Sequence, residues 1–381
     1  MGGRIVLAYN TSWYVWNFRM PLIAALRERG YEVVVLAPED EYSGRIAASG
    51  VALRHIGLDA KGLNPLRELA AVFAFVGAYR RLEPDLVLQY TIKPNIYGSI
   101  AARFLGIPAI NNLTGLGAVF EGGGALQRIV RALYRFAFRK VDKLFFQNPD
   151  DLELFIEGGL AKRDRCGLLP GSGVDLERFR PMPRNATSDE GDSRFVFLFV
   201  GRLLKAKGVD LLVEAARSVK ERRPDAVIRL LGRRDDADPG AADPVALDAA
   251  IASGLVEYAG ATDDVRPFIA ASDCVVLPSY YREGTPRSLL EAAAMGKPLI
   301  AADSVGTREP VADGVNGYLC RPRDAADLAS KMMAMLDAPA DRIAAMGAAS
   351  RRIARERFDE TIVIRSYIES IETILRSRKG S

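Results

Sequence analysis

The stretch CVVLPSYYREGTPRSLLEAAAMGKPLIAAD, residues 274–303, runs from an apolar segment through a polar loop and a helical pattern to a second apolar segment. Cys274–Leu277 predicts one strand and Pro298–Ala301 another. Between them the pattern predicts a helix over Arg287–Met295, which Gly296 would end. A strand, a helix and a strand in this order form a parallel pair with the helix on one face of the sheet. The stretch therefore predicts an α/β fold.

The same alternation precedes this stretch in a first half of the chain. Its predicted strands are Arg4–Ala8, Glu32–Leu36, Leu86–Gln89, Ala109–Asn112 and Leu144–Gln147. Its predicted helices are Phe18–Arg29, Leu66–Leu82, Asn95–Leu105 and Ala125–Val141. In the second half the further predicted strands are Phe195–Val200 and Ala226–Leu231, and the further predicted helices are Val209–Glu221, Val245–Ser253 and Asp324–Leu336.

A chain of 381 residues is long enough for two hydrophobic cores. Residues 180–193, RPMPRNATSDEGDS, are rich in proline and polar residues and show no periodicity, which indicates a linker. We expect a first Rossmann-like domain over 1–180, a linker over 181–193 and a second Rossmann-like domain over 194–355. A C-terminal helix over 356–381 is expected to pack back on the first domain. Two such domains bind ligands in the cleft between them, at the carboxyl ends of their strands.

The composition excludes several classes of protein. Hydrophobic residues make up 49% and charged residues 26% of the chain, and the net charge is only +4, which does not favour nucleic-acid binding. The sequence shows no signal peptide and no apolar run near the roughly 20 residues of a membrane span. Three cysteines without metal-ligand spacing favour a reducing compartment. The single histidine, His55, lies in a predicted strand edge, so a Ser-His-Asp mechanism is not expected.

Two glutamates flank a predicted helix start. Thr285 is a suitable N-cap and Pro286 a suitable first helical residue, so the N–H groups of Arg287 and Ser288 would point toward an anion such as a diphosphate. Glu283 precedes this start, and Glu291 follows it in a helix that is apolar on most sides. Each carboxylate can accept two hydroxyl hydrogens, as a ribose or a sugar ring requires.

A second group of residues follows the first strand of the second half. In FVFLFVGRLLKAKGVDLL, residues 195–212, Gly201 and Arg202 end the strand and Lys207 precedes the turn at Gly208. Two cations beside a glycine turn are suited to a diphosphate.

With GRLLKAKG and REGTPRSLLEAAAMGKPLI some 80 residues apart, the chain resembles glycosyltransferase family 4, whose members are retaining enzymes of the GT-B fold. The resemblance covers nearly the whole chain and includes VEYAGATDDVRPFIAASDCVVLPSYY and GTREPVADGVNGYL. It implies that Arg202 and Lys207 neutralise the diphosphate of a nucleotide sugar, that Glu291 binds the ribose, and that Glu283 faces the transferred sugar. Gly260–Asp264 would contribute to the base pocket.

The first half resembles bacterial enzymes that extend sugars linked to polyprenyl diphosphate in glycan, O-antigen or capsule assembly. The relevant segments are NTSWYVWNFRMPLIAALRERGYEV and QYTIKPNIYGSIAARFLGIPAINNLTGLGAVF. The resemblance implies a hexose or N-acetylhexosamine donor, with UDP as the expected nucleotide. Many family members place a histidine against the donor sugar in this half, whereas this chain reads Asn111-Asn112-Leu113-Thr114-Gly115. Asn112, Thr114 and Asn17 are the candidates for contacts with sugar or acceptor.

No metal or other cofactor is expected beyond the nucleotide sugar. Asp236-Ala237-Asp238 resembles the metal-binding Asp-x-Asp of another transferase architecture, but it lies among turn residues, which favours a solvated loop. The cations and the helix start would perform the role of the metal.

A basic amphipathic pattern indicates a membrane-facing surface. Arg128, Arg131, Arg135 and Arg139 recur at steps of three and four residues among apolar and aromatic neighbours, as in helices that bind anionic lipid. We therefore expect a cytoplasmic enzyme that is peripheral on the inner face of the plasma membrane. A solvated face over a core helix is the alternative interpretation.

Other functions remain open at this point. A dehydrogenase is disfavoured because the first strand lacks G-x-G-x-x-G, and a glycosidase would leave Arg202 and Lys207 unexplained. A non-hydrolysing UDP-sugar epimerase shares the fold, and a non-catalytic protein that binds nucleotide sugars would share the site.

Overall fold

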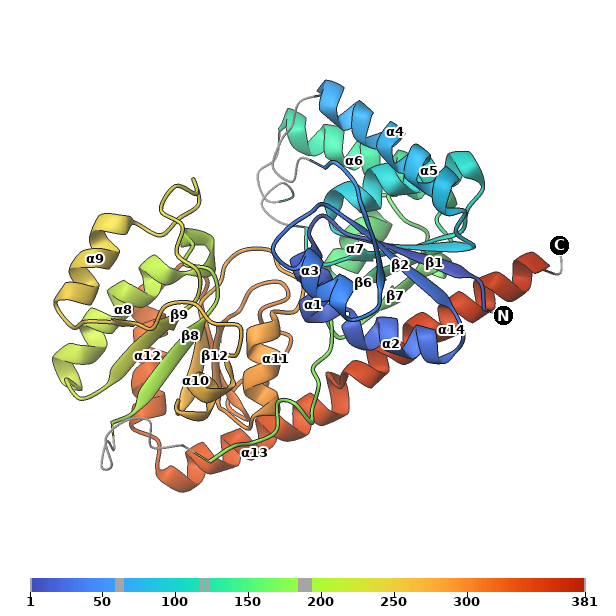
Figure 1. The fold of residues 1–381 in the computed structure, drawn as a ribbon. Coiled ribbons are helices and arrows are strands. Elements are labelled where there is room, and N and C mark those ends of the chain that lie inside the picture. Colours follow the sequence, from blue (N-terminus) through green and yellow to red (C-terminus); the bar gives the residue numbers. More distant parts are fainter. Residues whose placement is uncertain (1, 59–64, 117–119, 121–123, 184–193, 380–381) are drawn as a thin grey trace. The chain divides into compact units, whose positions relative to one another are not determined.

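The computed structural model describes residues 2–58, 65–116, 120, 124–183 and 194–379. The chain forms two compact units, the first made of Met1–Ser172 with Thr361–Ser381 and the second of Gly173–Glu360. Each unit is built on one parallel β-sheet covered by helices (Figure 1). Most of the predicted linker lies outside the described residues.

The first unit contains a sheet of seven strands in the order β3-β2-β1-β4-β5-β6-β7. The strands are β1 (Arg4–Ala8), β2 (Glu32–Ala37), β3 (Ala52–His55), β4 (Leu86–Tyr90), β5 (Ala109–Leu113), β6 (Lys143–Phe146) and β7 (Cys166–Leu168). Alternate residues of β1 enter the two cores on either side of the sheet, with Ile5 and Leu7 on one face and Val6 and Ala8 on the other. His55 is exposed at the end of the edge strand β3, so the predicted strand edge is confirmed.

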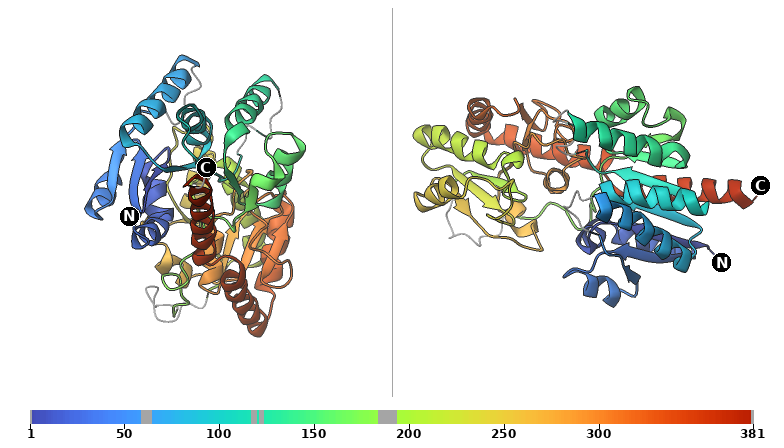
Figure 2. Two further views of the ribbon diagram at one scale, coloured as in Figure 1. Left: turned by 90° about the vertical axis from the view of Figure 1, so that its right-hand side faces the viewer. Right: turned by 90° about the horizontal axis from the view of Figure 1, so that it is seen from above.

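Helices cover both faces of this sheet (Figures 1 and 2). One face carries α1 (Ser12–Phe18), α2 (Met20–Glu28), α3 (Ser43–Ala48) and α14 (Glu360–Lys379). The other carries α4 (Pro65–Leu82), a π-helical turn (Pro94–Gly98), α5 (Ser99–Leu105), α6 (Ala125–Ala137) and α7 (Pro149–Glu157). Short 3-10 turns occur at Phe138–Lys140 and Arg163–Arg165.

The predicted helix Phe18–Arg29 corresponds to α2, Met20–Glu28, whereas the preceding helix α1 was not predicted. The two helices are separated at Arg19, whose φ of −128° and ψ of −5° are not helical. Pro21 has no N–H to donate, so it fits the first turn of a new helix but not the interior of a continuous one.

The second unit contains a sheet of six strands in the order β10-β9-β8-β11-β12-β13. The strands are β8 (Val196–Val200), β9 (Val227–Leu231), β10 (Glu257–Tyr258), β11 (Cys274–Leu277), β12 (Leu299–Ala302) and β13 (Gly317–Cys320). The helices are the 3-10 turn Lys205–Lys207, α8 (Val209–Arg222), α9 (Pro244–Ala252), α10 (Arg266–Ala270), α11 (Arg287–Ala294), α12 (Ala325–Leu336) and α13 (Ala340–Arg357). One continuous core joins them, within which α8 packs on α12 and α11 on α13.

Over the ranges that the structure describes, no helix combines the length and the apolar character that crossing a bilayer requires.

Candidate functional site

The loop after β8 and the loop after β11 lie together at the carboxyl edge of the second unit's sheet. The carbonyl oxygen of Ala206 accepts hydrogen bonds from the N–H groups of Tyr280 and Tyr281, at 3.2 and 3.3 Å. The Ser279 hydroxyl oxygen also lies 3.2 Å from it. A single backbone oxygen therefore fastens two loops that are far apart in the sequence. The edge is where parallel α/β sheets bind ligands.

Two glycines allow these loops to approach closely. Gly208 has φ +78° at the start of α8, and a Cβ there would overlap the carbonyl oxygen of Pro278. Gly306 has φ +79°, and a Cβ there would overlap the carbonyls of Glu283 and Gly284. Both positions combine a left-handed backbone with no space for a side chain, so only glycine fits without displacement.

Glu283 is held by the loop after β8 and by its own loop. Its Oε2 lies 2.5 Å from the Nζ of Lys207, and its Oε1 accepts a hydrogen bond of 2.5 Å from the Ser279 hydroxyl. The two charged side chains are only 11% and 20% exposed. The carboxylate therefore has a fixed orientation, and the structure brings together the predicted residues Lys207 and Glu283.

Glu291 forms an ion pair within α11. The Nε of Arg287 lies 3.0 Å from Oε1 of Glu291, one helical turn away, and both side chains are largely buried. Burial raises the pKa of Glu291 above its ordinary value, and the Arg287 guanidinium opposes that shift. The predicted position of Glu291 inside an apolar helix is confirmed, since Leu289, Leu290 and the following alanines are buried.

The predicted start of this helix at Arg287 is confirmed, but the predicted capping is wrong by one residue. Pro286 is the N-cap, with ψ 123°, and α11 begins at Arg287. Thr285 precedes the cap, and Pro286 itself makes no side-chain capping hydrogen bond. The φ of about −65° that the proline ring imposes is compatible with this extended conformation, so Pro286 fits outside the helix. Arg287 and Ser288 are still the first two helical residues, whose N–H groups have no intrahelical acceptor.

Arg202 differs from the other predicted cations. Its side chain is exposed and makes no hydrogen bond or ion pair with any residue that the structure describes. The adjacent Gly201 closely contacts Gly232, the first residue after β9, and the N–H of Gly232 donates to the carbonyl of Gly260 at 2.7 Å. Gly201 and Gly260 thus lie on one tight edge formed by three neighbouring strands.

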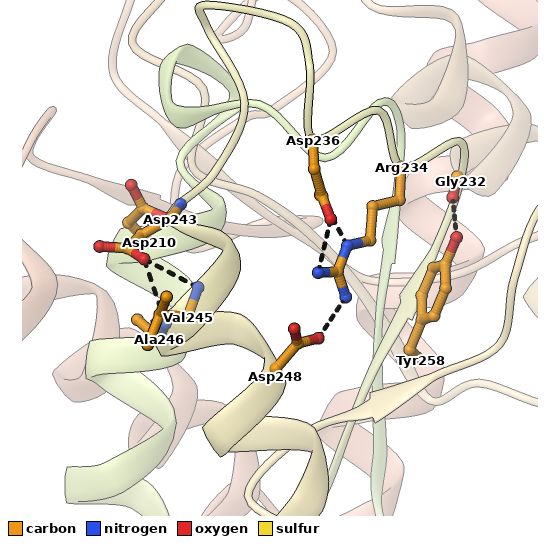
Figure 3. Close-up of polar contacts among 9 residues, drawn as sticks. All are labelled: Asp210, Gly232, Arg234, Asp236, Asp243, Val245, Ala246, Asp248 and Tyr258. Carbon is orange, nitrogen blue, oxygen red and sulfur yellow. Dashed lines mark hydrogen bonds and ion pairs between the residues drawn. The ribbon is translucent and has the colours of Figure 1, made fainter.

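Sequence reasoning did not identify several side chains at this edge. The Tyr258 hydroxyl donates to the carbonyl of Gly232 at 3.1 Å (Figure 3). The guanidinium of Arg323 lies 4.6 Å above the ring centre of Tyr280. Ser279, which orients Glu283, follows the end of β11 by two residues, a position that could have drawn attention to it.

The Asp-x-Asp segment is tied to neighbouring side chains (Figure 3). The guanidinium of Arg234 binds both oxygens of Asp236, at 2.7 and 2.8 Å, and reaches Asp248 at 2.5 Å. Asp238 accepts a hydrogen bond from the N–H of Gly240. In the described ranges, no three His, Cys, Asp or Glu residues come together as a metal ion would require.

The predicted residues of the first unit have different environments. Asn112 is fully buried, and its Nδ2 donates a hydrogen bond of 2.8 Å to the Tyr367 hydroxyl. In this conformation its side chain stabilises the core of the first unit. Asn17 donates to the Trp13 carbonyl at 2.9 Å. Thr114 is half-buried just after β5, at the carboxyl edge of the sheet.

The four arginines predicted to form a membrane-facing surface do not form one uniform face. Arg128 and Arg139 are exposed. Arg135 donates to the carbonyls of Gly158 and Gly159, where α7 ends, and Arg131 lies against Gly158. Arg131 and Arg135 therefore contact the C-terminal end of α7, where the helix dipole favours a positive charge.

Comparison with known protein families agrees with this architecture. The family described as "Glycosyl transferases group 1" matches residues 194–338, and the "Glycosyl transferase 4-like domain" matches residues 15–172. The two matches cover most of the chain and fall on its two halves. The protein is a family 4 type glycosyltransferase. The predicted class of enzyme is thereby confirmed.

Relatives of this glycosyltransferase include two bacterial enzymes. One is the N,N'-diacetylbacillosaminyl-diphospho-undecaprenol alpha-1,3-N-acetylgalactosaminyltransferase of Campylobacter jejuni, 29% identical over 376 residues, which are 95% of this chain and 96% of the relative. The other is the UDP-Gal:alpha-D-GlcNAc-diphosphoundecaprenol alpha-1,3-galactosyltransferase of Escherichia coli, 27% identical over 275 residues, 69% of each chain.

The fold of this glycosyltransferase is also found in solved structures. Anabaena HepE in complex with UDP superposes with a TM-score of 0.80 at 20% identity, over 98% of this chain and 100% of the other. The glycosyltransferase has the predicted GT-B fold, with two α/β domains.

Proposed function

We propose that this enzyme transfers a hexose or N-acetylhexosamine, with retention of configuration, from a UDP-sugar to a saccharide linked to polyprenyl diphosphate. The observation that carries the proposal is the relation to the Campylobacter enzyme over nearly the full length of both chains. That relative transfers N-acetylgalactosamine to a diphospho-undecaprenol-linked sugar, as its name states. The Escherichia relative also uses a diphosphoundecaprenol-linked acceptor.

The geometry of the second unit supports specific roles in this reaction. Arg202 and Lys207 bind the diphosphate, helped by the N–H groups of Arg287 and Ser288. Glu291 binds the ribose hydroxyls, and Glu283 faces the transferred sugar. The pairing of Lys207 with Glu283 links the diphosphate contact to the sugar contact through one ion pair.

The chemistry needs little from a protein base. As the bond to the anomeric carbon breaks, negative charge grows on the leaving diphosphate, whose oxygen can take the proton of the attacking hydroxyl. Fixed cations beside that diphosphate stabilise the transition state more than the ground state. Thr285, Gly201 and Gly260 shape the donor pocket, and Thr114 and Asn17 lie where the acceptor or sugar is bound.

Incubation with a panel of radiolabelled UDP-sugars, with and without a synthetic polyprenyl-diphosphate saccharide, tests the proposal. Transfer predicts release of UDP only with the acceptor, and an extended lipid-linked product of α configuration. An epimerase would instead interconvert UDP-sugars without acceptor, and a binding protein would produce no turnover. Glu283→Gln should be inactive, whereas Glu257→Gln, on the edge strand β10, serves as the matched control.

We also propose that the first unit binds the inner face of the plasma membrane, as a peripheral cytoplasmic enzyme. Side chains on the neighbouring helices α4, α5 and α6 support this location. Large apolar residues are exposed there, namely Leu69, Phe73, Phe104, Ile129 and Phe136. The guanidinium of Arg103 lies 5.0 Å above the ring of Phe136, and exposed Arg128 and Arg139 add charge. Apolar anchors among cations suit an anionic lipid surface.

Flotation with liposomes tests this surface. The wild type should float with vesicles that contain phosphatidylglycerol and much less with pure phosphatidylcholine. The double variant Arg128→Glu/Arg139→Glu should lose most of the difference, whereas Arg222→Glu/Arg355→Glu in the second unit should keep it. Equal flotation of both double variants would show that the surface is not the membrane contact.

A further inference from the structure

Arg19 is a buried cation in the first unit. It lies between α1 and α2, and only 2% of its surface is exposed. Its Nε donates a hydrogen bond of 2.9 Å to the Tyr9 hydroxyl, and its guanidinium lies 4.5 Å above the ring centre of Tyr90. The rings of Tyr9 and Tyr90 are stacked at 4.4 Å. A cage of aromatic rings therefore surrounds the charge.

The described neighbours of Arg19 leave its charge without a carboxylate. The groups that influence it electrostatically are Tyr9, Tyr90 and Tyr367. Burial raises the pKa of each of these phenols above its ordinary value, so all three are neutral near pH 7. The carboxylate that contacts α1, that of Asp40, binds the N–H groups at the opposite end of the helix.

The hydrogen-bonding capacity of Arg19 is also mostly unused. A guanidinium has five N–H donors, and here the one on Nε is bound. The two terminal nitrogens make no hydrogen bond with the described residues, yet neither is completely sealed from solvent. Four N–H donors in a planar fork therefore remain for a ligand. Such a fork matches two oxygens of a phosphate group.

The position of Arg19 in the sheet favours a ligand over a purely structural charge. Tyr9 directly follows β1, and Tyr90 ends β4, which pairs with β1. The cage therefore lies at the carboxyl edge of the first unit's sheet, the edge at which α/β domains bind ligands. A buried cation without a counter-ion is costly, and an anionic ligand would offset that cost when it binds.

From this juxtaposition, which rests on the proposed function, we infer that Arg19 binds a phosphate group of the diphosphate that links the acceptor saccharide to its lipid. The tyrosine cage orients the guanidinium and keeps water from competing with the phosphate. Arg19 is a binding residue in this scheme and does not touch the reacting atoms. It selects acceptors that carry a diphosphate over neutral glycosides of the same sugar.

The test compares two acceptors, the saccharide on farnesyl diphosphate and the same saccharide on a neutral aryl group. Arg19→Met should raise the KM for the diphosphate acceptor about 10- to 100-fold, the effect of losing a charge-assisted contact. The KM values for the aryl acceptor and for the UDP-sugar should change less than threefold. Arg19→Lys should recover part of the loss. Arg27→Met, an exposed arginine on α2, is the matched control.

A second measurement does not depend on transfer. With UDP saturating the donor site, inorganic pyrophosphate should raise the Tm of the wild type and of Arg27→Met, but not of Arg19→Met. If Arg19→Met does not fold, the same measurement on Arg19→Lys decides, with a pyrophosphate affinity at least threefold weaker than that of the wild type expected. Equal KM increases for both acceptors, or an unchanged pyrophosphate response, would overturn the inference. Failure of the wild type to transfer to either acceptor would refute the proposed function instead. The pyrophosphate titration would still test whether Arg19 binds a phosphate group.

Discussion

The ion pair between Lys207 and Glu283 allows us to predict how Glu283→Gln changes both the stability of the protein and its affinity for UDP. Replacing Glu283 with Gln keeps the shape of the side chain and removes its charge. Because the pair is largely buried, with a 2.5 Å contact, loss of the charge leaves Lys207 partly uncompensated. We expect the variant to lose about 1–3 kcal/mol of unfolding free energy, the cost of leaving a partly buried polar group unsatisfied. In a domain of this size that is a fall of roughly 2–4 °C in Tm per kcal/mol.

The same substitution should have the opposite effect on UDP binding. Removing a carboxylate beside Lys207 removes a repulsion for the UDP diphosphate, so the affinity for UDP should stay the same or increase. Transfer should nevertheless fall by at least about 100-fold if Glu283 contacts the sugar in the transition state. Arg202→Ala should instead weaken the affinity for UDP, by about 10- to 100-fold, because the substitution removes a charge-assisted contact with the diphosphate.

Calorimetric titration with UDP, thermal unfolding and single-turnover transfer separate these effects. A double-mutant cycle with Lys207→Met should give a coupling free energy of about 1–2 kcal/mol in unfolding. Our reasoning is refuted if Glu283→Gln weakens UDP binding as much as Arg202→Ala does. A coupling within about 0.3 kcal/mol of zero would show that the ion pair does not order the loops.

Two further predictions concern the same edge of the sheet. Because burial raises the pKa of Glu291, its folded form favours the protonated state, so its contribution to stability is present at low pH and is lost as the pH rises through the folded pKa. UDP affinity should change in the other direction, weakening as the pH falls through the raised pKa of Glu291 and the carboxylate becomes protonated, and Glu291→Gln should remove that part of the pH profile in calorimetric titrations. Gly208→Ala should lower both Tm and UDP affinity, since the methyl group would overlap the Pro278 carbonyl and displace the adjacent loop. Gly254→Ala, with φ +71° and open space at its Cβ, should cost only about 1 kcal/mol of backbone strain and leave UDP affinity unchanged, and equal effects of the two alanines would contradict the argument.

The sequence alone predicts most of the central strands. Strands such as β1 and β11 are continuous apolar runs because both faces are buried, and their bounds, Arg4–Ala8 and Cys274–Leu277, agree with the predictions. The strands β7, β10 and β13 were not predicted. They lie at sheet edges, have at most four residues and are mostly half-buried, so no apolar run or alternation marks them.

The candidate site was predictable in its residue types but not in its pairings. A glycine turn and two cations indicate an anion site wherever they follow a strand. The contact of Lys207 with Glu283 joins loops after two different strands, and the order of those strands is not encoded locally. The cage around Arg19 is similar, because Tyr9 and Tyr90 become neighbours only when β1 pairs with β4.

The charges at the edge of the second unit assign different tasks to its cations. Lys207 is paired with Glu283, and Arg287 with Glu291, so each glutamate already has a cation within 3.0 Å. Arg202 has no such partner among the described residues and is exposed, and with it the five side chains carry a net charge of about +1. A diphosphate is bound best by a cation that can turn toward it without breaking an existing pair, and of Arg202, Lys207 and Arg287 we expect Arg202 to do so. The paired lysine adds charge from a fixed position, where two of its three donors remain for phosphate oxygens. Substitution of Arg202 should therefore lower mainly the affinity for the nucleotide, whereas substitution of Glu283 should lower mainly the rate of transfer and the stability.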